Sequence, residues 1–470
     1  MSSLADATPA IALGSLDGRY RSAVAPLVDH LSEPALNRAR LHVEIEWLIH
    51  LTDHEVVPGV RRLTGDEKQQ LRRVVDDFGP AAIEELATTE RVTQHDVKAV
   101  EYFLKKRLAD IAPAAEDAGL AELIHFACTS EDINNLSYAL MVQGAVAKVW
   151  FPTAQAVVEV VARMARETRG MPLLAHTHGQ PATPTTLGKE LAVLARRLGR
   201  QLSRIERTEY LGKLNGATGT YGAHLAAVPG ADWPAISRSF VEGLGLEWNP
   251  LTTQIESHDW QAELYADVAR FNRILHNLCT DVWTYISMGY FAQVRGQGTV
   301  GSSTMPHKVN PIRFENAEAN LEVSNALLDV LASTLVSSRL QRDLTDSSMQ
   351  RNIGTAFGHS LLALDNVSRG LAGLDPVPAA MATDLDANWE VLGEPVQSAM
   401  RALGAQGVPG MEEPYERLKE LTRGRRIGQV ELVEFVRGLG LPEEVEERLA
   451  AMTPQTYVGL APELVDLLDS

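Results

Sequence analysis

Proline is missing from three long parts of this sequence, and this absence constrains the fold more than any other feature does. The proline-free parts are residues 185–228, 251–305 and 312–375, each far longer than an average helix. Proline inside a helix removes a backbone donor and clashes with the preceding turn. Its absence over such lengths therefore predicts long, uninterrupted helices.

Apolar residues in two of these parts recur at spacings of three and four, which is the period of an α-helix. The first set is Leu187, Leu191, Leu194, Leu198, Leu202 and Ile205, and the second is Leu264, Val268, Phe271, Leu275, Leu278, Val282 and Ile286. Such stripes are typical of helices packed in a bundle. Because they are long and carry few caps, they also suit a bundle that other copies of the chain complete.

The rest of the sequence divides the chain into three expected helical domains. Residues 1–118 contain shorter helical segments separated by VVPGV and DFGPAA, and residues 372–470 contain short, charged ones after GLDPVP. Residues 119–371 are expected to form a long central bundle. Strand signals are scarce, and residues 213–228 are the best candidate for irregular or hairpin structure. The predicted fold class is all-α.

Charge and cysteine content limit the kind of protein this can be. Acidic residues number 61 against 43 basic ones, a net charge of −18 without a dense basic block, which disfavours nucleic-acid binding. The two cysteines, Cys128 and Cys279, exclude a disulfide framework and favour a reducing compartment. The opening residues do not resemble a signal peptide, and no apolar run approaches the ~20 residues that span a bilayer. We therefore expect a cytoplasmic protein with no membrane partner.

The segment LLAHTHGQPATPTTLGKE, residues 173–190, places His176 and His178 ahead of an expected long helix. The pair could bind a metal, but no nearby Asp, Glu or Cys completes a recognisable ligand set, so a metal site is not favoured. A turn held by Pro181 and Pro184 is a second interpretation. The better-supported one is proton transfer, for which an imidazole in a polar turn is suited near neutral pH.

Two other segments place polar residues where helices are expected to begin. In TSEDINN, Thr129 and Ser130 would either cap the helix or leave its first amides to bind a carboxylate or phosphate, and both interpretations stay open. In TQHDVKAVEYFL, Asp96 is an ordinary capping residue, whereas His95 has no evident structural task.

The segment SRLQRDLTDSSMQRNIG, residues 338–354, combines arginines with serines. Asp343 and Asp346 partly offset the arginines, so a solvated helix face is one interpretation. Ser347 and Arg351, however, are four apart and share a helical face, and the planar guanidinium matches phosphate oxygens. Together with Arg342 they predict a phosphate clamp.

A polar loop, GSSTMPHKVNP, occupies residues 301–311 between expected helices. Its two prolines exclude a helix interior. A simple connector would need neither two adjacent serines nor a lysine among polar groups, and loops of this kind often close over a substrate.

This loop resembles the signature loop of the fumarase/aspartase superfamily. With HDVKAVEYFL, IHFACTSEDINNLS, THGQPATP, TTQIESHD, FEN and LQRDLTDSS, the sequence resembles the adenylosuccinate lyase family of that superfamily, in its bacterial purine-biosynthesis form. The similarity runs from DGRY at 17–20 to MTPQTYVG near the C-terminus.

The resemblance implies a carbon–nitrogen lyase that forms a nearly all-helical homotetramer, with each active site shared between three subunits. It implies succinyl-purine nucleotides as the substrates. These are adenylosuccinate, giving AMP and fumarate, and the succinylcarboxamide ribotide SAICAR, giving AICAR and fumarate. It also implies that no metal or organic cofactor is needed.

The resemblance further implies roles for matching residues. His178 would protonate the leaving nitrogen, Glu315 would hold that imidazole charged, and Ser302 would remove the carbon-bound proton, although Ser303 remains an alternative base. Lys308 and His95 complete the implied catalytic set. The implied substrate-binding residues are Arg19, Tyr20, Gln94, His95, Asp96, Thr129, Ser130, Gln254, Ser302, Lys308, Val309, Asn310, Asn316, Arg342, Ser347, Ser348, Met349, Gln350 and Arg351.

Within this set, Lys308, Asn310, Thr129 and Ser130 would bind the carboxylate beside the reacting carbon. The purine and succinyl groups would lie against His95, Asp96 and Gln254. The phosphate and ribose would be held by Arg19, Tyr20, Arg342, Ser347 and Arg351.

Two departures and two rival hypotheses qualify the resemblance. Gln94 and Ser257 differ from the family pattern, which leaves fine substrate contacts open. A lyase of the same superfamily acting on argininosuccinate or aspartate would not need a phosphate clamp. A structural protein that keeps the fold without activity is expected to have lost His178 or the loop residues, which are present here.

Overall fold

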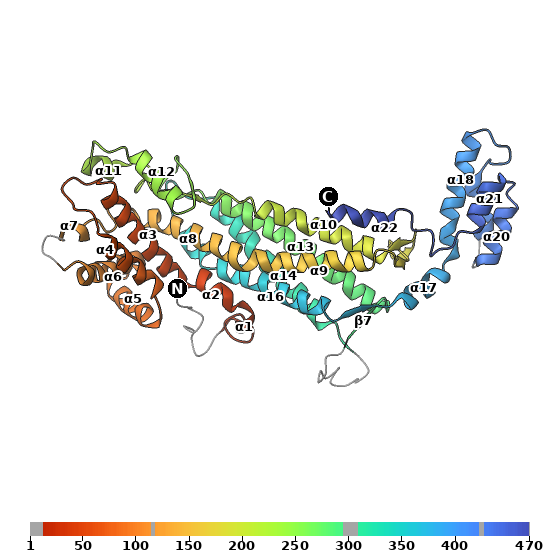
Figure 1. Ribbon diagram of the computed structural model, residues 1–470, viewed down its shortest axis with the longest axis horizontal. Helices are drawn as coiled ribbons and strands as arrows, with labels where there is room; N and C mark the ends of the chain where they lie inside the picture. The colour runs from red at the N-terminus through yellow and green to blue at the C-terminus, as the bar shows by residue number, and fades with distance from the viewer. Residues whose placement is uncertain (1–12, 114–117, 295–308, 423–426, 470) are drawn as a thin grey trace. The chain divides into compact units, whose positions relative to one another are not determined.

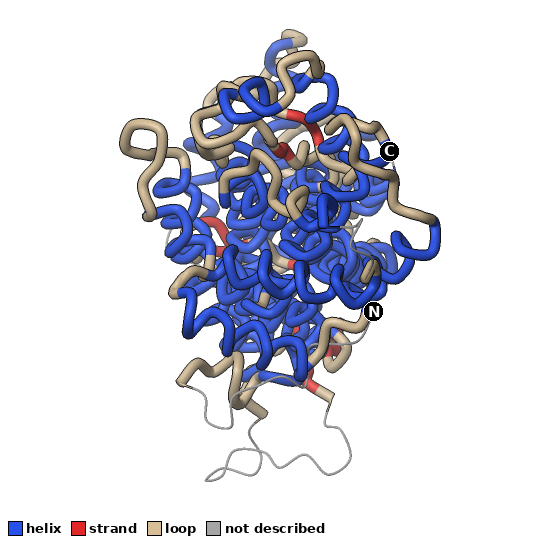
Figure 2. The backbone as a smooth tube through the Cα atoms, turned by 90° about the vertical axis from the view of Figure 1, so that its left-hand side faces the viewer, coloured by secondary structure: helices blue, strands red, loops and turns tan. Residues whose placement is uncertain are grey.

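The computed structural model describes residues 13–113, 118–294, 309–422 and 427–469. Helices dominate this described part, and its strands are paired segments of only two or three residues (Figures 1 and 2). The predicted all-α fold class is confirmed.

The chain divides into two compact units. Unit 1 comprises Met1–Ala154, Gln201–Arg273 and Ala317–Asp365, and unit 2 comprises Gln155–Arg200, Ile274–Asn316 and Asn366–Ser470. The division into domains 1–118, 119–371 and 372–470 stays a prediction.

The N-terminal part of unit 1 consists of short and medium helices, as its turn signals predict. They are α1 (Arg21–Val24), η1 (Ala25–Leu27), α2 (Val28–Leu31), α3 (Glu33–Asp53), α4 (Gly65–Asp76), α5 (Pro80–Thr93), α6 (Asp96–Ile111) and α7 (Ala118–Ala121). Ser32 caps α3 by accepting the Ala35 amide at 3.2 Å, and Pro80 opens α5 at the position where proline costs no hydrogen bond. Helix α3 packs against α8 (Ser130–Ala145), and α5 packs against α6 (Figure 1).

Five long helices contribute residues to both units. They are α9 (Phe151–Glu167), α10 (Leu187–Ile205), α13 (Asp259–Ser287), α14 (Ile312–Leu335) and α16 (Ile353–Leu371). Four of these, α10, α13, α14 and α16, lie in the proline-free parts, so the prediction of long helices there is confirmed. The whole α10 stripe is buried, as is the α13 stripe from Leu264 to Val282.

A buried polar chain ties three of these helices together in unit 1. Ser360 of α16 accepts the Trp150 indole N–H at 2.8 Å and donates to Asn272 of α13 at 2.8 Å. Asn272 donates to Ser324 of α14 at 3.1 Å, and Ser324 donates to the Ala356 carbonyl at 2.8 Å. Since buried polar groups are costly without partners, this chain fixes the helix register more narrowly than apolar packing alone.

The remaining elements of unit 1 include a short π-helix and an irregular region. They are η3 (Val146–Trp150), β5 (Leu211–Gly212), α11 (Gly222–Ala227), α12 (Trp233–Gly243), β6 (Glu247–Trp248) and α15 (Thr345–Gln350). The irregular structure predicted for 213–228 is confirmed up to Tyr221, after which α11 begins.

Unit 2 combines short antiparallel strand pairs with a cluster of small helices. Its strands are β1 (Pro172–Leu173), β2 (His176–Thr177), β3 (Gln180–Pro181), β4 (Thr185–Thr186), β7 (Phe291–Gln293) and β8 (Leu374–Pro376), paired antiparallel as β1–β4, β2–β3 and β7–β8. Its helices are α17 (Pro378–Asp386), η4 (Trp389–Leu392), α18 (Gly393–Ala405), α19 (Pro414–Thr422), α20 (Gln429–Arg437), α21 (Glu443–Ala450), α22 (Ala461–Leu464) and η5 (Val465–Asp469).

Among the described residues, one helical run, Ser130–Glu167, is long and apolar enough to cross a membrane by length and composition alone, with a mean hydropathy of 1.3 over an 18-residue window. Polar and charged residues interrupt this helix, so it is not a continuous apolar run of the length that spans a bilayer. The run also carries Asp132, whose carboxylate pairs with a buried lysine, and Asn134 and Asn135, which hydrogen-bond inside unit 1. These polar contacts are those of a core helix.

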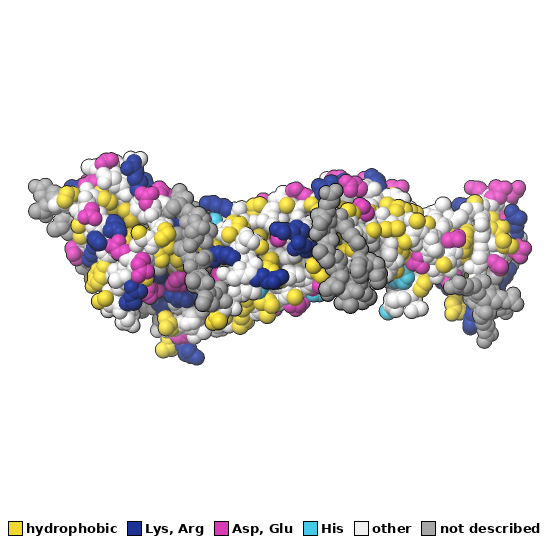
Figure 3. All heavy atoms as spheres, turned by 90° about the horizontal axis from the view of Figure 1, so that it is seen from below, with side chains coloured by type: hydrophobic (Ala, Val, Ile, Leu, Met, Phe, Trp, Pro, Cys, Tyr) yellow, Lys and Arg dark blue, Asp and Glu magenta, His cyan; other side chains and the backbone are white. Residues whose placement is uncertain are grey.

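Exposed apolar residues lie on the long helices as well as in loops. Val193 on α10, Trp283 on α13, and Val323 and Val330 on α14 are each more than 40% exposed. On the face drawn in Figure 3, hydrophobic side chains lie among interspersed basic and acidic ones. Helix α14 thus presents apolar side chains on its outer face as well as its buried one.

Candidate active site

The start of α6 is held by two arginines of unit 1. Asp96 accepts from the buried Arg40 at 2.8 Å and lies 3.2 Å from Arg351. Arg40 also donates to Asn134 of α8 at 2.9 Å. Burial alone would raise the pKa of Asp96, but the charge of Arg40, the Val97 amide and the charge of Arg351 outweigh it, so this pKa lies below its usual value. The predicted residues Asp96 and Arg351 are therefore neighbours.

Arg342 joins three predicted segments of unit 1. Its Nη2 lies 2.9 Å from Glu131 at the start of α8, and its Nη1 donates to Gln254 at 3.4 Å. The Gln254 amide nitrogen in turn donates to the Ala217 carbonyl at 2.9 Å. Burial raises the pKa of Glu131, although the charge of Arg342 opposes this. The structure thus brings Arg342 and Gln254 together.

A close approach of backbone to backbone fixes the loop beside Gln254. Gly219 has a φ of +74°, and a Cβ there would lie 2.1 Å from the Thr252 carbonyl oxygen. Only glycine fits such a position. The side chain of Asn215 adds a hydrogen bond to the Thr252 hydroxyl at 2.8 Å.

Several buried polar atoms near Arg342 have no hydrogen-bond partner within the described residues. They are Arg342 Nε, Asp346 Oδ2 and Gln350 Oε1. His258 approaches Asp346 Oδ2 only to 3.7 Å. Unsatisfied buried groups are rare in native proteins, so their concentration here marks a place where a ligand or water completes the hydrogen bonding.

The predicted pairing of Ser347 with Arg351 is confirmed. Arg351 Nη1 donates to the Ser347 carbonyl at 3.0 Å and to its hydroxyl at 2.9 Å. Ser348 and Met349 lie in the same short helix, α15. The other edge of the Arg351 guanidinium meets Glu33, the first residue of α3, with Nε 3.3 Å from Oε2.

His95 has a structural task that the sequence interpretation missed. It is the N-cap of α6, and its Nδ1 accepts the Lys98 amide at 3.2 Å. The interpretation that it has none is therefore wrong. Gln94, in the left-handed conformation with a φ of 52°, ends α5 and turns the chain into this cap. Because Nδ1 accepts, a neutral His95 carries its proton on Nε2.

Thr129 and Ser130 lie at the start of α8, as predicted. Asp132 accepts the Thr129 amide at 2.9 Å, so helix capping is part of the explanation for this segment. The Asp132 carboxylate also accepts the Asn215 amide at 3.0 Å and pairs with Lys213 at 2.7 Å, and both members of this ion pair are fully buried.

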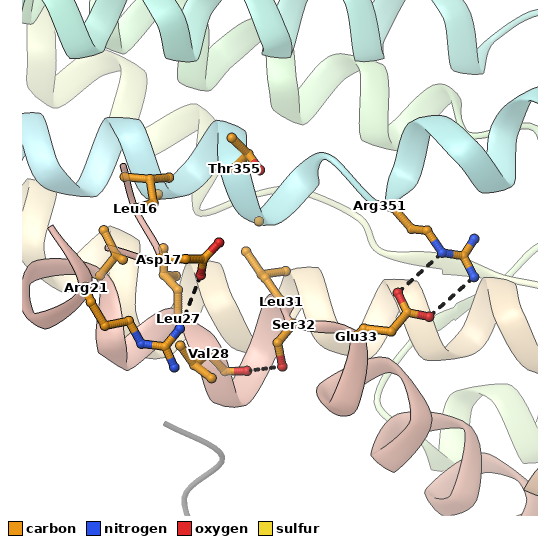
Figure 4. A pocket seen from close by; sticks show the side chains of 13 residues that line it. Leu16, Asp17, Arg21, Leu27, Val28, Leu31, Ser32, Glu33, Arg351 and Thr355 are labelled. Atoms are coloured by element: carbon orange, nitrogen blue, oxygen red, sulfur yellow. Dashed lines mark hydrogen bonds and ion pairs between the residues drawn. The ribbon is translucent and has the colours of Figure 1, made fainter. Parts of the chain in front are cut away.

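Arg19 and Tyr20 precede α1 in unit 1. The Arg19 guanidinium carbon lies 5.8 Å from the Tyr20 ring centroid. Close to them in sequence, Asp17 and Arg21 pair at 3.2 Å and line a cavity of about 280 Å³ (Figure 4). Glu33 and Arg351 line the same cavity, together with apolar residues of η1 and α2.

His178 lies at the tip of the β2–β3 hairpin in unit 2. Thr177 pairs with Gln180, so His178 and Gly179 form a two-residue turn, with φ values of 54° and 74°. Positive φ at both positions is typical of the tight turn that matches strand twist. The imidazole is exposed, and within the described residues no hydrogen bond reaches it.

Glu315 lies in the first turn of α14, also in unit 2. It accepts the Trp283 indole N–H at 3.1 Å, and no hydrogen bond or ion pair joins Glu315 and His178, both of which the structure describes. Asn316 follows it in the helix. Just before α14, the Val309 carbonyl accepts from Gln293 at 2.8 Å, and the half-buried Asn310 follows.

Three predicted loop residues lie outside the described residues. These are Ser302, its alternative Ser303, and Lys308. Among the residues that are described, no group of three His, Cys, Asp or Glu side chains has an arrangement that could hold a metal ion.

Sequence reasoning missed several residues that hold the predicted ones in place, namely Glu33, Arg40, Glu131 and Lys213. Arg40 lies in α3 among the polar residues Asn37, Arg38 and His42, so its sequence context gives no signal that it is buried. Lys213 follows Leu211 and Gly212 in an irregular segment, which gives no such signal either.

Comparisons with known proteins agree with the sequence motifs. A family model described as "Lyase" matches residues 18–323, and one described as "Adenylosuccinate lyase C-terminal" matches residues 338–458. The chain is 48% identical over 457 residues to adenylosuccinate lyase of Escherichia coli (strain K12), covering 97% of this chain and 98% of the relative. The chain belongs to the adenylosuccinate lyase family. It is therefore a lyase of the fumarase/aspartase superfamily.

Other relatives and structures extend this result. The chain is 47% identical over 458 residues to adenylosuccinate lyase of Vibrio cholerae, with 97% of this chain and 98% of the relative covered. The crystal structure of a fumarate lyase from Mesorhizobium sp. BNC1 matches with a TM-score of 0.74 at 19% identity, over 94% of this chain and 97% of that one. A β-carboxy-cis,cis-muconate cycloisomerase from Acinetobacter calcoaceticus matches with a TM-score of 0.70 at 16% identity, over the same shares of the two chains. At these identities the structural matches show the fold alone.

Proposed function

We propose that this chain catalyses the elimination of fumarate from adenylosuccinate, giving AMP, and from SAICAR, giving AICAR. The observation that carries this proposal is the cluster in unit 1, where one network of hydrogen bonds and ion pairs contains Asp96, Gln254, Arg342, Ser347 and Arg351. Its two halves are joined through Glu131, Asn134 and Arg40. Near-complete similarity to relatives named adenylosuccinate lyase supports it.

The substrate supplies the reason for such a cluster. A succinyl-purine nucleotide carries a phosphate and two carboxylates, so a site for it needs guanidinium and amide donors. An argininosuccinate or aspartate lyase has no phosphate to hold. Arg342 and Arg351, with Arg19 and Tyr20, therefore favour the nucleotide substrates over those of other superfamily members.

The proposed chemistry needs one acid and one base. His178 protonates the leaving nitrogen, and Glu315 of another copy holds the imidazole charged. Ser302 removes the proton beside the carboxylate, and Lys308, Asn310, Thr129 and Ser130 stabilise the doubly charged aci-carboxylate that results. Serine is a weak base in water, so closure of a loop around it and exclusion of water are part of the proposal.

The proposed assembly is a cytoplasmic homotetramer whose active sites each draw residues from three subunits. The exposed apolar residues of α10 and α14 support it, since such positions are covered when helices of several copies pack together. The exposed imidazole of His178 supports it as well, because a general acid works best where water is excluded. No cofactor is proposed.

A direct assay tests the function. Purified protein should convert adenylosuccinate to AMP, followed by the change in ultraviolet absorbance, and should leave argininosuccinate unchanged. Turnover of argininosuccinate instead would assign the chain to another lyase activity. Activity that survives exhaustive chelation is expected, and activity restored only by a divalent ion would contradict the mechanism.

A further inference from the structure

Arg351 presents two edges to different partners, and Asp96 lies 3.2 Å from Nη2, the nitrogen that both edges share. Nη1 donates to the carbonyl and hydroxyl of Ser347 at 3.0 and 2.9 Å. On the Nε edge, the Glu33 carboxylate lies with Oε2 3.3 Å from Nε and Oε1 3.3 Å from Nη2, as the two dashed lines in Figure 4 show. Glu33 thus meets the guanidinium with both of its oxygens.

This two-point arrangement is the one in which a guanidinium binds phosphate oxygens. Since Ser347 takes Nη1, the edge that Glu33 covers is the edge left for a phosphate. We propose that Glu33 occupies the phosphate-binding edge of Arg351 while no nucleotide is bound, and that the substrate phosphate displaces it. The inference rests on the proposed function, which places a phosphate at Arg351.

Glu33 is the carboxylate of this cluster best placed to leave. Its side chain is 49% exposed, against 26% for Asp96 and 4% for Glu131. Asp96 is also held by Arg40 at 2.8 Å, and Glu131 by Arg342 at 2.9 Å. Arg351 is the only cation within ion-pair distance of Glu33 among the residues the structure describes.

Space for the displaced side chain lies next to it. The cavity of about 280 Å³ is lined by Glu33 and Arg351 themselves, and by Thr355, whose hydroxyl offers a polar contact (Figure 4). The other acid in its lining, Asp17, already has Arg21 at 3.2 Å. A rotation of Glu33 toward this cavity and solvent would expose the Nε edge of Arg351 without moving a helix.

The arrangement makes the site selective by charge. A ligand can bind this edge only if it displaces the Glu33 carboxylate from Arg351, which costs free energy. A dianionic phosphate therefore competes better than a single carboxylate does. Glu33 therefore lowers the affinity for every phosphate ligand and discourages binding of dicarboxylates in its place.

Binding of AMP and of inorganic phosphate to Glu33→Gln, measured by calorimetry, tests the inference. Loss of one half-exposed ion pair should tighten both by about two- to fivefold. Glu242→Gln is the matched control, because Glu242 pairs with Arg238 at 2.9 Å and is 48% exposed. It should bind both ligands as the unaltered protein does.

A second variant guards against a folding defect in the first. Glu33→Asp keeps the charge at the start of α3 but shortens the side chain away from the guanidinium, so it should also tighten phosphate binding. Weaker or unchanged AMP and phosphate binding in the folded variants would overturn the inference. Turnover of adenylosuccinate by the unaltered protein tests the proposed function separately, since a protein without turnover can still show the Glu33 effect on phosphate.

Discussion

The arginine cluster of unit 1 and the His178 hairpin of unit 2 present their polar groups in opposite ways. In unit 1, Arg40, Arg342 and Arg351 each have a carboxylate or amide partner within the same chain. In unit 2, the imidazole of His178 lies exposed on a two-residue turn. The binding groups are thus prearranged by their own chain, whereas the proposed acid is presented outward.

This difference is what we expect if one copy of the chain binds the substrate and another copy supplies the proposed acid to the same site. A prearranged charged cluster requires partners shielded from water, and unit 1 supplies them in the buried Glu131 and the partly buried Asp96. A general acid works best in an environment from which water is excluded, and the exposed turn that carries His178 does not exclude water. The acid would acquire that environment only when another copy covers it.

The largest expected effect is that of removing the proposed general acid, His178, in unit 2. His178→Ala should lower turnover of adenylosuccinate by about a hundredfold or more, the range for a lost general acid. AMP binding and the melting temperature should change little, because no described residue hydrogen-bonds to this exposed side chain. Single-turnover rates with calorimetry separate these quantities.

Mixing two variants tests whether the arginine cluster of one copy and His178 of another copy serve the same active site. An exchanged mixture of His178→Ala and Arg342→Ala subunits should regain part of the lost activity, since some sites would then combine an intact histidine with an intact arginine. Mixtures that remain inactive after thorough exchange would mean that each site is built within one chain.

The sequence could predict the helices because their signal is local and repeated. The stripes of α10 and of α13 up to Val282 are buried as expected, and the proline-free parts contain long helices. The hairpin from His176 to Pro181 was not predicted, because strands of two residues are too short to show the alternation of apolar and polar residues that predicts a strand.

The sequence predicted the motif residues of the candidate site but not the residues that hold them in place. Ser347 and Arg351 are one helical turn apart, so their contact follows from spacing. Glu33 and Arg351 are far apart in sequence, and no pattern around either residue predicts that they form an ion pair. His95 was misjudged because helix caps are usually hydroxyl, carboxylate or amide side chains, although an imidazole nitrogen accepts the same backbone proton.

A third prediction tests how far unit 1 depends on its buried ion pair. Lys213→Met should lower the free energy of unfolding by about 3–5 kcal/mol, because it leaves the fully buried Asp132 without its cation. The double variant Asp132→Asn, Lys213→Met also removes the charge of Asp132, and it should recover part of the lost free energy of unfolding. Urea unfolding at a fixed protein concentration provides the measurement.

The matched control for this prediction is Arg238→Met. Arg238 pairs with Glu242 at 2.9 Å, but the two side chains are 61% and 48% exposed, so the cost should stay below about 1 kcal/mol. Equal losses in Lys213→Met and Arg238→Met would show that the buried pair does not hold the start of α8 in place.

The smallest expected effect concerns pH and the contact between α3 and the segment before α8. Glu44 accepts the His125 amide at 3.0 Å and lies 2.6 Å from its Nδ1. Burial lowers the pKa of His125, but the hydrogen bond and charge of Glu44 outweigh it and raise this pKa above its usual value. A raised folded pKa contributes stability that is complete below about pH 6.5 and is lost as pH rises through the folded value.

His125→Gln should therefore remove a pH-dependent part of the stability, about 1 kcal/mol, that the unaltered protein has at low pH. Between about pH 6 and pH 8.5, unfolding in urea should show a decline in the unaltered protein that is smaller in the variant. The exposed His176 provides the control, and His176→Gln should keep the decline. An equal decline in His125→Gln would mean that the His125–Glu44 pair stays charged, or stays neutral, across this whole range.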